Sequence, residues 1–463
     1  MHIEETEIPL TEQFDNIISR EEKLAIQDFL NNQNISDVAE LIYERPEYES
    51  QIIAHLSIHR AAGVFKILDV PVQKRIIQNL PTFKSAELLN ELPADDRVAF
   101  LEEIPTSAVR DMIKILDPEE RKITLELLGY PENSVGRLMT PGYIYVYEYN
   151  TANEVLETIR RFGKNTETID VIYVIDDKGV LLDDLRIKDI ILASPEAKVN
   201  ELMDGRFISL HATDDQEVAN EVFKMNNRVA LPVTDDHDIL LGIVTIDDVL
   251  WVASEEFGED IQKIGGTEAL DAPYLSISIP KLVRKRAGWL VLLFLGEMLT
   301  ATAMQFFQKE IEAATVLALF IPLIMSSGGN SGSQASTLII QAMALGELTI
   351  TDWWKVMRRE ILSGVLLGAI LGSIGFLRIL LWQNLHIFDY GDYWELVATT
   401  IFFSLMGIVL WGSLMGSMLP IILKRLKLDP ASSSAPFVAT LVDVTGIVIY
   451  FSVAYFFLQG KLL

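Results

Sequence analysis

The chain has 463 residues, of which 50% are hydrophobic, with a mean hydropathy of +0.27 and a formal charge of −27. It is too long for one ordinary domain and too apolar for an ordinary soluble protein. The acidic balance excludes a nucleic-acid-binding face, which would need clustered Lys and Arg. Because the sequence has no cysteine, disulfides, thiolate metal sites and Cys nucleophiles are excluded too.

Charge is distributed unevenly along the chain. Residues 284–463 hold 12 Lys and Arg against 11 Asp and Glu, which places a formal charge of −28 on residues 1–283. An acidic region of this kind favours a cationic partner. The first five residues have neither a basic segment nor an apolar one, so we expect no cleavable signal peptide and insertion through internal spans.

Residues 1–135 are expected to form an α-helical N-domain. Three stretches, beginning at Leu68, Glu91 and Leu116, place a proline near a helix start and continue with apolar residues at helical spacing. Their separation of roughly 22 to 25 residues predicts a small helical solenoid, with an irregular helical bundle as the alternative.

Residues 136–252 contain an α/β unit that occurs twice. Residues 174–177 match 233–236, and 187–189 match 246–248, both at an offset of 59. Each unit alternates short β-branched runs with helical patterns. The sequence therefore predicts two α/β copies packed as a pseudo-twofold pair.

The residues that carry this repeat resemble a tandem of CBS domains. The resemblance implies that Thr245 and Asp248 hold an adenosine ribose, and hence that ATP binds the CBS pair. The first copy has Asp183 where the second has Gly242, and Arg186 where the second has Thr245, so at most one typical nucleotide site is expected. A purely structural module that transmits motion is the alternative.

A connecting helix is expected over residues 253–283, broken at Gly265 and Gly266. The transmembrane pore domain, residues 284–463, is predicted to be all-α. It contains five apolar stretches, each long enough for a hydrocarbon layer of about 30 Å. The five spans are 287–308, 313–345, 361–382, 395–423 and 436–459.

Basic residues set the predicted orientation of these spans. They gather before the first span, between the second and third, and between the fourth and fifth. The positive-inside rule then places the amino-terminal domains in the cytosol and the carboxy terminus outside, as in a multi-pass protein of the cell (inner) membrane.

The second span is rich in glycine and hydroxyl residues from Pro322 to Gln334, including Gly328, Gly329 and Asn330. At membrane depth such residues must line water or pack against protein. A broken or kinked helix here would turn carbonyl groups and the two amide side chains toward a hydrated ion path. Close helix packing through small residues is the alternative.

The fifth span carries a lone carboxylate, Asp443. An ionised Asp near mid-membrane is costly and marks an ion pathway by default. Only Arg378, in the third span, could serve as a counter-ion there. Glu297, in the first span, is the other intramembrane acid, and it could instead sit protonated in packing or near an interface.

Residues 322–334 resemble the Gly-Gly-Asn signature of the MgtE family of magnesium channels, and residues 439–446 resemble its pore-lining fifth helix. The order of domains matches as well. The resemblance implies Mg2+ uptake by a homodimer in the lipid bilayer, with Asp443 of both subunits at a pore on the twofold axis. Carboxylates that bind the water shell of Mg2+ suit an ion that dehydrates reluctantly.

The segment between Arg228 and Lys263 has no basic residue, and acids on one face of a helix repel one another unless a cation neutralises them. The acidic start of an N-domain helix is the best candidate to face this segment. We therefore expect cytosolic Mg2+ to bind at the interface of the N-domain and the CBS pair and to close the channel. The predicted sensor residues are Asp95, Asp96, Asp247, Asp248, Glu255, Glu256, Glu259 and Asp260.

An enzyme is not expected, because the sequence contains no Walker loop, no Gly-x-Ser-x-Gly elbow and no His/Glu zinc pattern. His55 and His59 stand four residues apart, but no third ligand is evident. Two alternatives within transport stay open. One is a Na+-coupled exchanger, as among related animal magnesium carriers, and the other is a broader divalent transporter that also carries Co2+.

Overall fold

The computed structural model describes residues 9–20, 22–270, 274–275 and 277–462. The chain divides into two compact units, Met1–Glu255 and Glu256–Leu463. In the described residues, the first unit holds a helical domain followed by two small sheets with helices, and the second holds five long apolar helices. The predicted fold class is therefore confirmed.

Short helices make up the N-domain. The first four are α1 (Leu10–Ile18), α2 (Lys23–Asn32), α3 (Ile35–Glu44) and α4 (Glu49–His55). They are followed by α5 (Ile58–Lys66), α6 (Val70–Asn79), α7 (Thr82–Glu91), α8 (Ala94–Glu102), α9 (Thr106–Ile115) and α10 (Pro118–Leu127). From α5 onward each helix begins 12 residues after the one before it. The expected spacing of roughly 22 to 25 residues thus spans two structural units.

Side-chain hydrogen bonds fix this period. Gln73, Arg97 and Arg121 each donate to the carbonyl oxygen eight residues earlier, at 2.8, 3.1 and 3.0 Å. Each bond ties the first half of one helix to the end of the helix before it. Helices also pack on the second helix along, α3 on α5, α4 on α6 and α5 on α7. This regular stacking supports the solenoid over the irregular bundle.

Two three-stranded sheets of the same topology follow. The first comprises β1 (Tyr145–Tyr147), β2 (Val171–Ile175) and β3 (Leu181–Arg186), and the second β4 (Leu210–His211), β5 (Ala230–Thr234) and β6 (Leu240–Thr245). In each sheet the central strand pairs parallel with the first and antiparallel with the third. The second and third strands of the two copies are offset by 59 residues, which confirms the predicted repeat.

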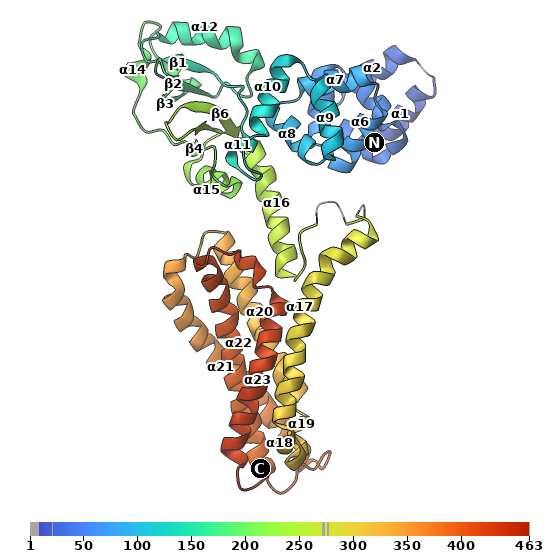
Figure 1. Cartoon of the computed structure of the whole chain (residues 1–463), viewed down its shortest axis with the longest axis vertical. Helices are drawn as coiled ribbons and strands as arrows, with labels where there is room; N and C mark the ends of the chain where they lie inside the picture. Colours follow the sequence, from blue (N-terminus) through green and yellow to red (C-terminus); the bar gives the residue numbers. More distant parts are fainter. Residues whose placement is uncertain (1–8, 21, 271–273, 276, 463) are drawn as a thin grey trace, which may run out of the picture. The chain divides into compact units, whose positions relative to one another are not determined.

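The two sheets face each other across a shared core. Tyr173 and Ile243, one from each sheet, are fully buried in it. Helices α12 (Ala152–Phe162) and α15 (Gln216–Asn226) cover the outer faces (Figure 1). Asp183, which replaces the glycine of the second copy, is buried and accepts three backbone N–H bonds, so its role in the first copy is structural.

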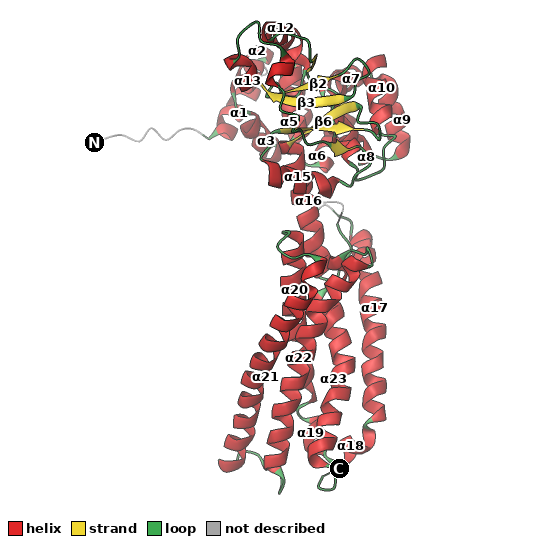
Figure 2. Cartoon of the chain, turned by 90° about the vertical axis from the view of Figure 1, so that its left-hand side faces the viewer, coloured by secondary structure: helices red, strands yellow, loops and turns green. Residues whose placement is uncertain are grey.

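Helix α16 (Ile246–Ile264) leaves the second sheet and ends at Gly265 and Gly266. Gly266 has a φ of +73°, a left-handed conformation that favours glycine, so the predicted break is confirmed. The long apolar helices are α17 (Ile279–Phe306), α20 (Ile321–Ala344), α21 (Trp353–Asn384), α22 (Trp394–Arg425) and α23 (Ala435–Leu458). They run side by side (Figure 2), and in the part of the chain that the structure describes these five helices are long and apolar enough to cross a membrane, as predicted.

Glycines set the spacing between these helices. A Cβ atom added at Gly368 would lie 2.6 Å from the Cα of Met406, and one at Gly416 would lie 2.1 Å from the carbonyl oxygen of Gly332. Helix α22 therefore packs backbone to backbone against α21 and α20. The predicted break in the second span is wrong, because α20 is continuous and its small residues pack instead. Between the first and second spans lie the short helices α18 (Gln308–Ala313) and α19 (Thr315–Ala318).

Candidate functional site

Three carboxylates meet where the N-domain packs on the α/β pair. Pro93 starts α8 and puts Asp95 and Asp96 in its first turn, and Asp248 lies in the first turn of α16. One oxygen atom from each of the three side chains lies within 4.8 Å of the other two. Oxygen ligands at this spacing suit Mg2+.

Asp95 is the most deeply placed of the three. Its side chain is 7% exposed, and its Oδ1 atom has no hydrogen-bond partner among the described residues. Burial, together with the charges of Asp248 and Asp96, raises the pKa of Asp95 well above its usual value. A buried carboxylate oxygen without a donor is costly unless a cation satisfies it.

Thr245 links the two acids at the start of α16. Its hydroxyl lies 2.6 Å from Asp247 Oδ1 and 2.6 Å from Asp248 Oδ2. One hydroxyl proton cannot serve both carboxylates, so one contact needs a proton on the acid. Burial raises the pKa of Asp248 to about 7, despite the hydrogen bond from Thr245. The two residues expected to hold a ribose are thus engaged with each other.

Sequence reasoning missed two charged residues at this cluster. Lys66, at the end of α5, places its Nζ atom 3.4 Å from Asp96 Oδ2 and 3.8 Å from Asp247 Oδ2. Burial alone would lower the pKa of Lys66, but the charges of Asp96 and Glu167 outweigh it and raise the pKa. Glu167, from the first α/β copy, adds a further negative charge.

The remaining predicted sensor residues lie farther along α16. Glu259 is eleven residues after Asp248, about 16 Å along a helix, so the two side chains cannot share one ion. Lys263 contacts Glu259 at 2.5 Å and Asp429 at 2.7 Å. Burial and the charge of Asp429 raise the pKa of Asp260. The predicted single acidic face is therefore two groups, and the second has its own lysine.

The negative charge of Glu256 contributes to the raised pKa of Asp260, so Glu256 belongs with the second group. The side chain of Glu255 is exposed and that of Glu256 is half-buried. Both residues lie on α16, outside the group of three carboxylates that converge at Asp95 among the described residues.

In the membrane helices, the glycine-rich stretch has two faces. Asn330 and Gln334 are exposed on α20, in line with Ser326, which Asn330 contacts through an amide hydrogen bond of 3.4 Å. Gly328 and Gly329 are buried on the other side, where Gly328 packs against α22 and α23. A Cβ atom at Gly329 would lie 3.8 Å from Asp443 Oδ1, so this glycine leaves room beside the carboxylate.

Asp443 and Glu297 lie at the same depth on neighbouring helices. Trp289 of α17 donates a 3.0 Å hydrogen bond to Ser434, directly before α23. Glu297 is eight residues beyond Trp289, and Asp443 is nine beyond Ser434, which gives heights of about 12 and 13.5 Å. The negative charge of Glu297 acts on Asp443. The two acids therefore share one height in the membrane helices, Asp443 half-buried on α23 and Glu297 exposed on α17.

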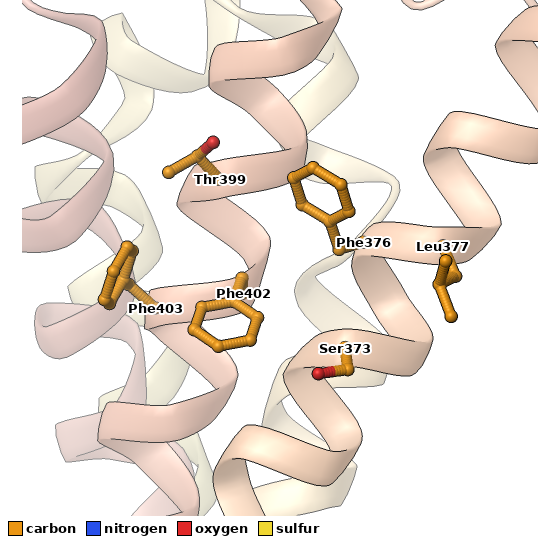
Figure 3. Close-up of a pocket in the computed structure, with 6 residues that line it drawn as sticks. All are labelled: Ser373, Phe376, Leu377, Thr399, Phe402 and Phe403. Carbon is orange, nitrogen blue, oxygen red and sulfur yellow. The ribbon is translucent and has the colours of Figure 1, made fainter.

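An apolar groove of about 480 Å³ lies between α21 and α22 (Figure 3). Phenylalanines and a leucine line it together with the hydroxyl groups of Ser373 and Thr399. None of its lining residues is charged, so it offers no site for a cation.

Fold and sites together define a class of protein: a membrane transporter of cations, with a helical domain and tandem CBS domains before five spans. Three comparisons give the particular family. A family model described as a divalent cation transporter, MgtE, matches residues 321–453, the MgtE intracellular N domain matches 33–133, and the CBS domain matches 135–196 and 199–255.

Relatives extend these matches. The magnesium transporter MgtE of Thermus thermophilus is 39% identical over 346 residues, 75% of each chain, and that of Bacillus subtilis is 27% identical over 433 residues, 92% of each. A crystal structure of the cytosolic domain of the Mg2+ channel MgtE in complex with ATP has a TM-score of 0.51 and 31% identity, covering 52% of this chain and 99% of that one. The chain belongs to the MgtE family of magnesium transporters. It is thus a multi-pass membrane protein with cytosolic amino-terminal domains, and not an enzyme.

Proposed function

We propose that this protein is a Mg2+-selective uptake channel that works as a homodimer in the inner membrane and closes when cytosolic Mg2+ rises. Its proposed parts are the N-domain 1–135, the CBS pair 136–252, the connecting helix 253–283 and the pore domain 284–463. The carboxy terminus would lie outside, which the basic loops between alternate spans support.

Asp443 is the proposed pathway carboxylate. It is half-buried in an apolar helix, with Gly329 leaving space beside it and a second acid at the same height. An intramembrane carboxylate without a basic partner among the described residues indicates an ion path. Asn330 and Gln334 would face the same path from α20, while Gly328 and Gly329 let the helices approach. A hydrated Mg2+ needs few direct ligands, which fits this sparse set.

Flux into liposomes tests this part of the proposal. Asp443→Asn should lower Mg2+ uptake at least about tenfold while the protein stays dimeric, because the amide keeps the shape and removes the charge. Asp392→Asn, an exposed acid in the loop before α22, is the matched control. Equal uptake by the two variants would reject Asp443. Uptake that persists without a Na+ gradient separates the channel from an exchanger, and parallel Co2+ uptake measures selectivity.

Closure by cytosolic Mg2+ rests on one observation above others: the buried Oδ1 of Asp95, beside Asp96 and Asp248, has no hydrogen-bond partner among the described residues. The residues fit a divalent ion, because they supply carboxylate oxygens from two elements that meet only when the N-domain is docked. A ligand shifts an equilibrium by its differential affinity for two states, and such an interface supplies that difference. Asp247, Glu255, Glu256, Glu259 and Asp260 remain proposed as supporting acids along α16.

Protease protection of the full-length protein tests this gate. Rising Mg2+ should protect the linker after α16 in the native protein, and Asp95→Asn should shift protection to higher Mg2+. Asp111→Asn, which alters an exposed acid paired with Lys114 in the same domain, should leave the response unchanged. If Asp95→Asn responds like the control, the sensor lies elsewhere.

ATP at the CBS pair is proposed as an additional ligand. A relative's cytosolic domain was crystallised with ATP, and Thr245 and Asp248 are the residues that would meet a ribose here. Because Asp248 also belongs to the acidic cluster, the two ligands would compete for it. Isothermal titration of the native protein with ATP, compared with Thr245→Val, would show whether the site exists.

A further inference from the structure

A lysine occupies the acidic cluster. Lys66 lies beside a group of five carboxylates. They belong to Asp95, Asp96, Asp247, Asp248 and Glu167. The Nζ atom of Lys66 lies 3.4 Å from Asp96 and 3.8 Å from Asp247, and its side chain is 28% exposed. The ammonium group thus bridges the N-domain acid to the acid of the α/β pair.

The lysine neutralises only part of the cluster. If all five carboxylates are ionised, the cluster with its one ammonium has a formal charge of −4, and the Oδ1 atom of Asp95 has no donor among the described residues. Lys66 therefore holds the interface together weakly without satisfying its deepest oxygen. A divalent cation in the cluster would bind the interface more strongly and would satisfy the Oδ1 atom of Asp95. It would then lie beside the positive charge of Lys66.

We infer that Lys66 is a resident counter-ion that partly neutralises the acidic cluster and sets the Mg2+ concentration at which the cluster binds its ion. This inference rests on the proposed sensor and specifies how that sensor is tuned. Mg2+ must displace the ammonium group from Asp96, or bind in spite of it. Removing the lysine charge should therefore tighten Mg2+ binding and loosen the interface that remains when Mg2+ is absent.

Coulomb's law gives the size of the effect. The carboxylate oxygens lie within 4.8 Å of one another, and Lys66 lies 3.4 Å from one of these residues, so an ion among them would be about 6 Å from Nζ. A divalent and a monovalent cation at that distance repel each other in water enough to weaken binding about tenfold. The lower dielectric constant of a partly buried site strengthens this repulsion, whereas salt and movement of the flexible ammonium group weaken it, so we expect an effect of about tenfold.

The test compares Lys66→Gln with two controls in the full-length protein, using MgCl2 as the probe. Lys66→Arg keeps the charge, and Lys74→Gln removes a similarly exposed lysine that pairs with Glu103 at 3.8 Å elsewhere in the N-domain. The midpoint of Mg2+-dependent protease protection is measured for each, together with the protection in chelator. Lys66→Gln should lower the midpoint about tenfold and weaken protection in chelator, while both controls stay within about twofold of the native protein.

The outcomes separate this inference from the proposed sensor. If the native protein shows no Mg2+ response that depends on Asp95, the sensor itself fails. If that response is present and Lys66→Gln has the native midpoint, or a higher one, the counter-ion role is overturned. Should Lys66→Gln prove unstable, Lys66→Met provides a second neutral variant, and a native midpoint there overturns the inference equally.

Discussion

Gly416→Ala should separate two helices of the membrane bundle. The new Cβ atom would lie 2.1 Å from the carbonyl oxygen of Gly332, and backbone atoms cannot move aside as a flexible side chain would. Reaching an allowed contact requires α22 and α20 to move apart by about 1 Å. The buried hydrogen bond of 2.8 Å between Ser331 and Ser413, one turn away, would lengthen as well.

The magnitude follows from three contributions. Overpacking of a tight interface costs about 1 to 3 kcal/mol, and weakening a buried interhelical hydrogen bond costs about 1 kcal/mol. Replacing glycine by alanine inside a helix returns about 1 kcal/mol. The net destabilisation is about 2 kcal/mol, which lowers the unfolding midpoint of a region of 150 to 250 residues by roughly 4 to 8 °C.

Gly407→Ala is the matched control, because it adds the same methyl group to the same helix. Its Cβ would meet only Ile449 Cγ2, at an ordinary 3.5 Å. Thermal unfolding in detergent and Mg2+ uptake in liposomes should both fall for Gly416→Ala and stay native for Gly407→Ala. Uptake should fall because a shift of α20 would also move Asn330 and Gly329 relative to Asp443. Native stability and flux in Gly416→Ala would refute the packing argument.

Three further predictions concern charged residues. In the folded state the pKa of Asp248 is about 7, above its usual value near 3.8. The stability of the Mg2+-free protein should therefore fall as pH rises from about 4 to 7 and then level off. Thermal unfolding in chelator should show a loss of at most about 2 kcal/mol between pH 5.5 and 7.5, and Mg2+ should remove that difference. Glu297→Gln should reduce Mg2+ flux less than Asp443→Asn does and change the ratio of Mg2+ to Co2+ uptake; an unaltered ratio assigns Glu297 to packing. Asp184→Asn should destabilise the cytosolic unit by about 3 kcal/mol, because it breaks a buried 2.7 Å ion pair with Arg228, and calorimetry that shows no lower midpoint would contradict this.

The parts predicted correctly from sequence have local signals. Spans were predicted because about 20 apolar residues in a row have few other uses, and the α/β repeat because identical dipeptides recur at one offset. The end of the helix at Gly265 and Gly266 was predicted from a local signal as well, the two adjacent glycines. The 12-residue period was missed although it has a local signal, since Pro81, Pro93 and Pro105 stand 12 residues apart and each directly precedes a helix.

The parts that were missed depend on contacts between distant residues. Lys66 is 30 positions from Asp96 and is brought to it only by the stacking of α5 to α8. Lys263 meets Asp429, from a loop far along the chain, so the acidic run near it was not free of basic partners. The continuity of α20 could not be predicted from its glycines alone. These glycines pack against Gly412 and Gly416, which belong to another span.

The 12-residue period of the N-domain also makes its length adjustable at one end only. Because each helix packs mainly on near neighbours, helices added before α1 would leave the stacking of α5 to α8 unchanged. Between α5 and α8 the same change would carry Lys66 away from Asp96, and after α8 it would carry Asp95 away from Asp248. The number of residues from α5 to α16 is thus fixed by the acidic cluster. Helices can be added at the amino-terminal side of the N-domain without changing the positions of the charged residues in the acidic cluster.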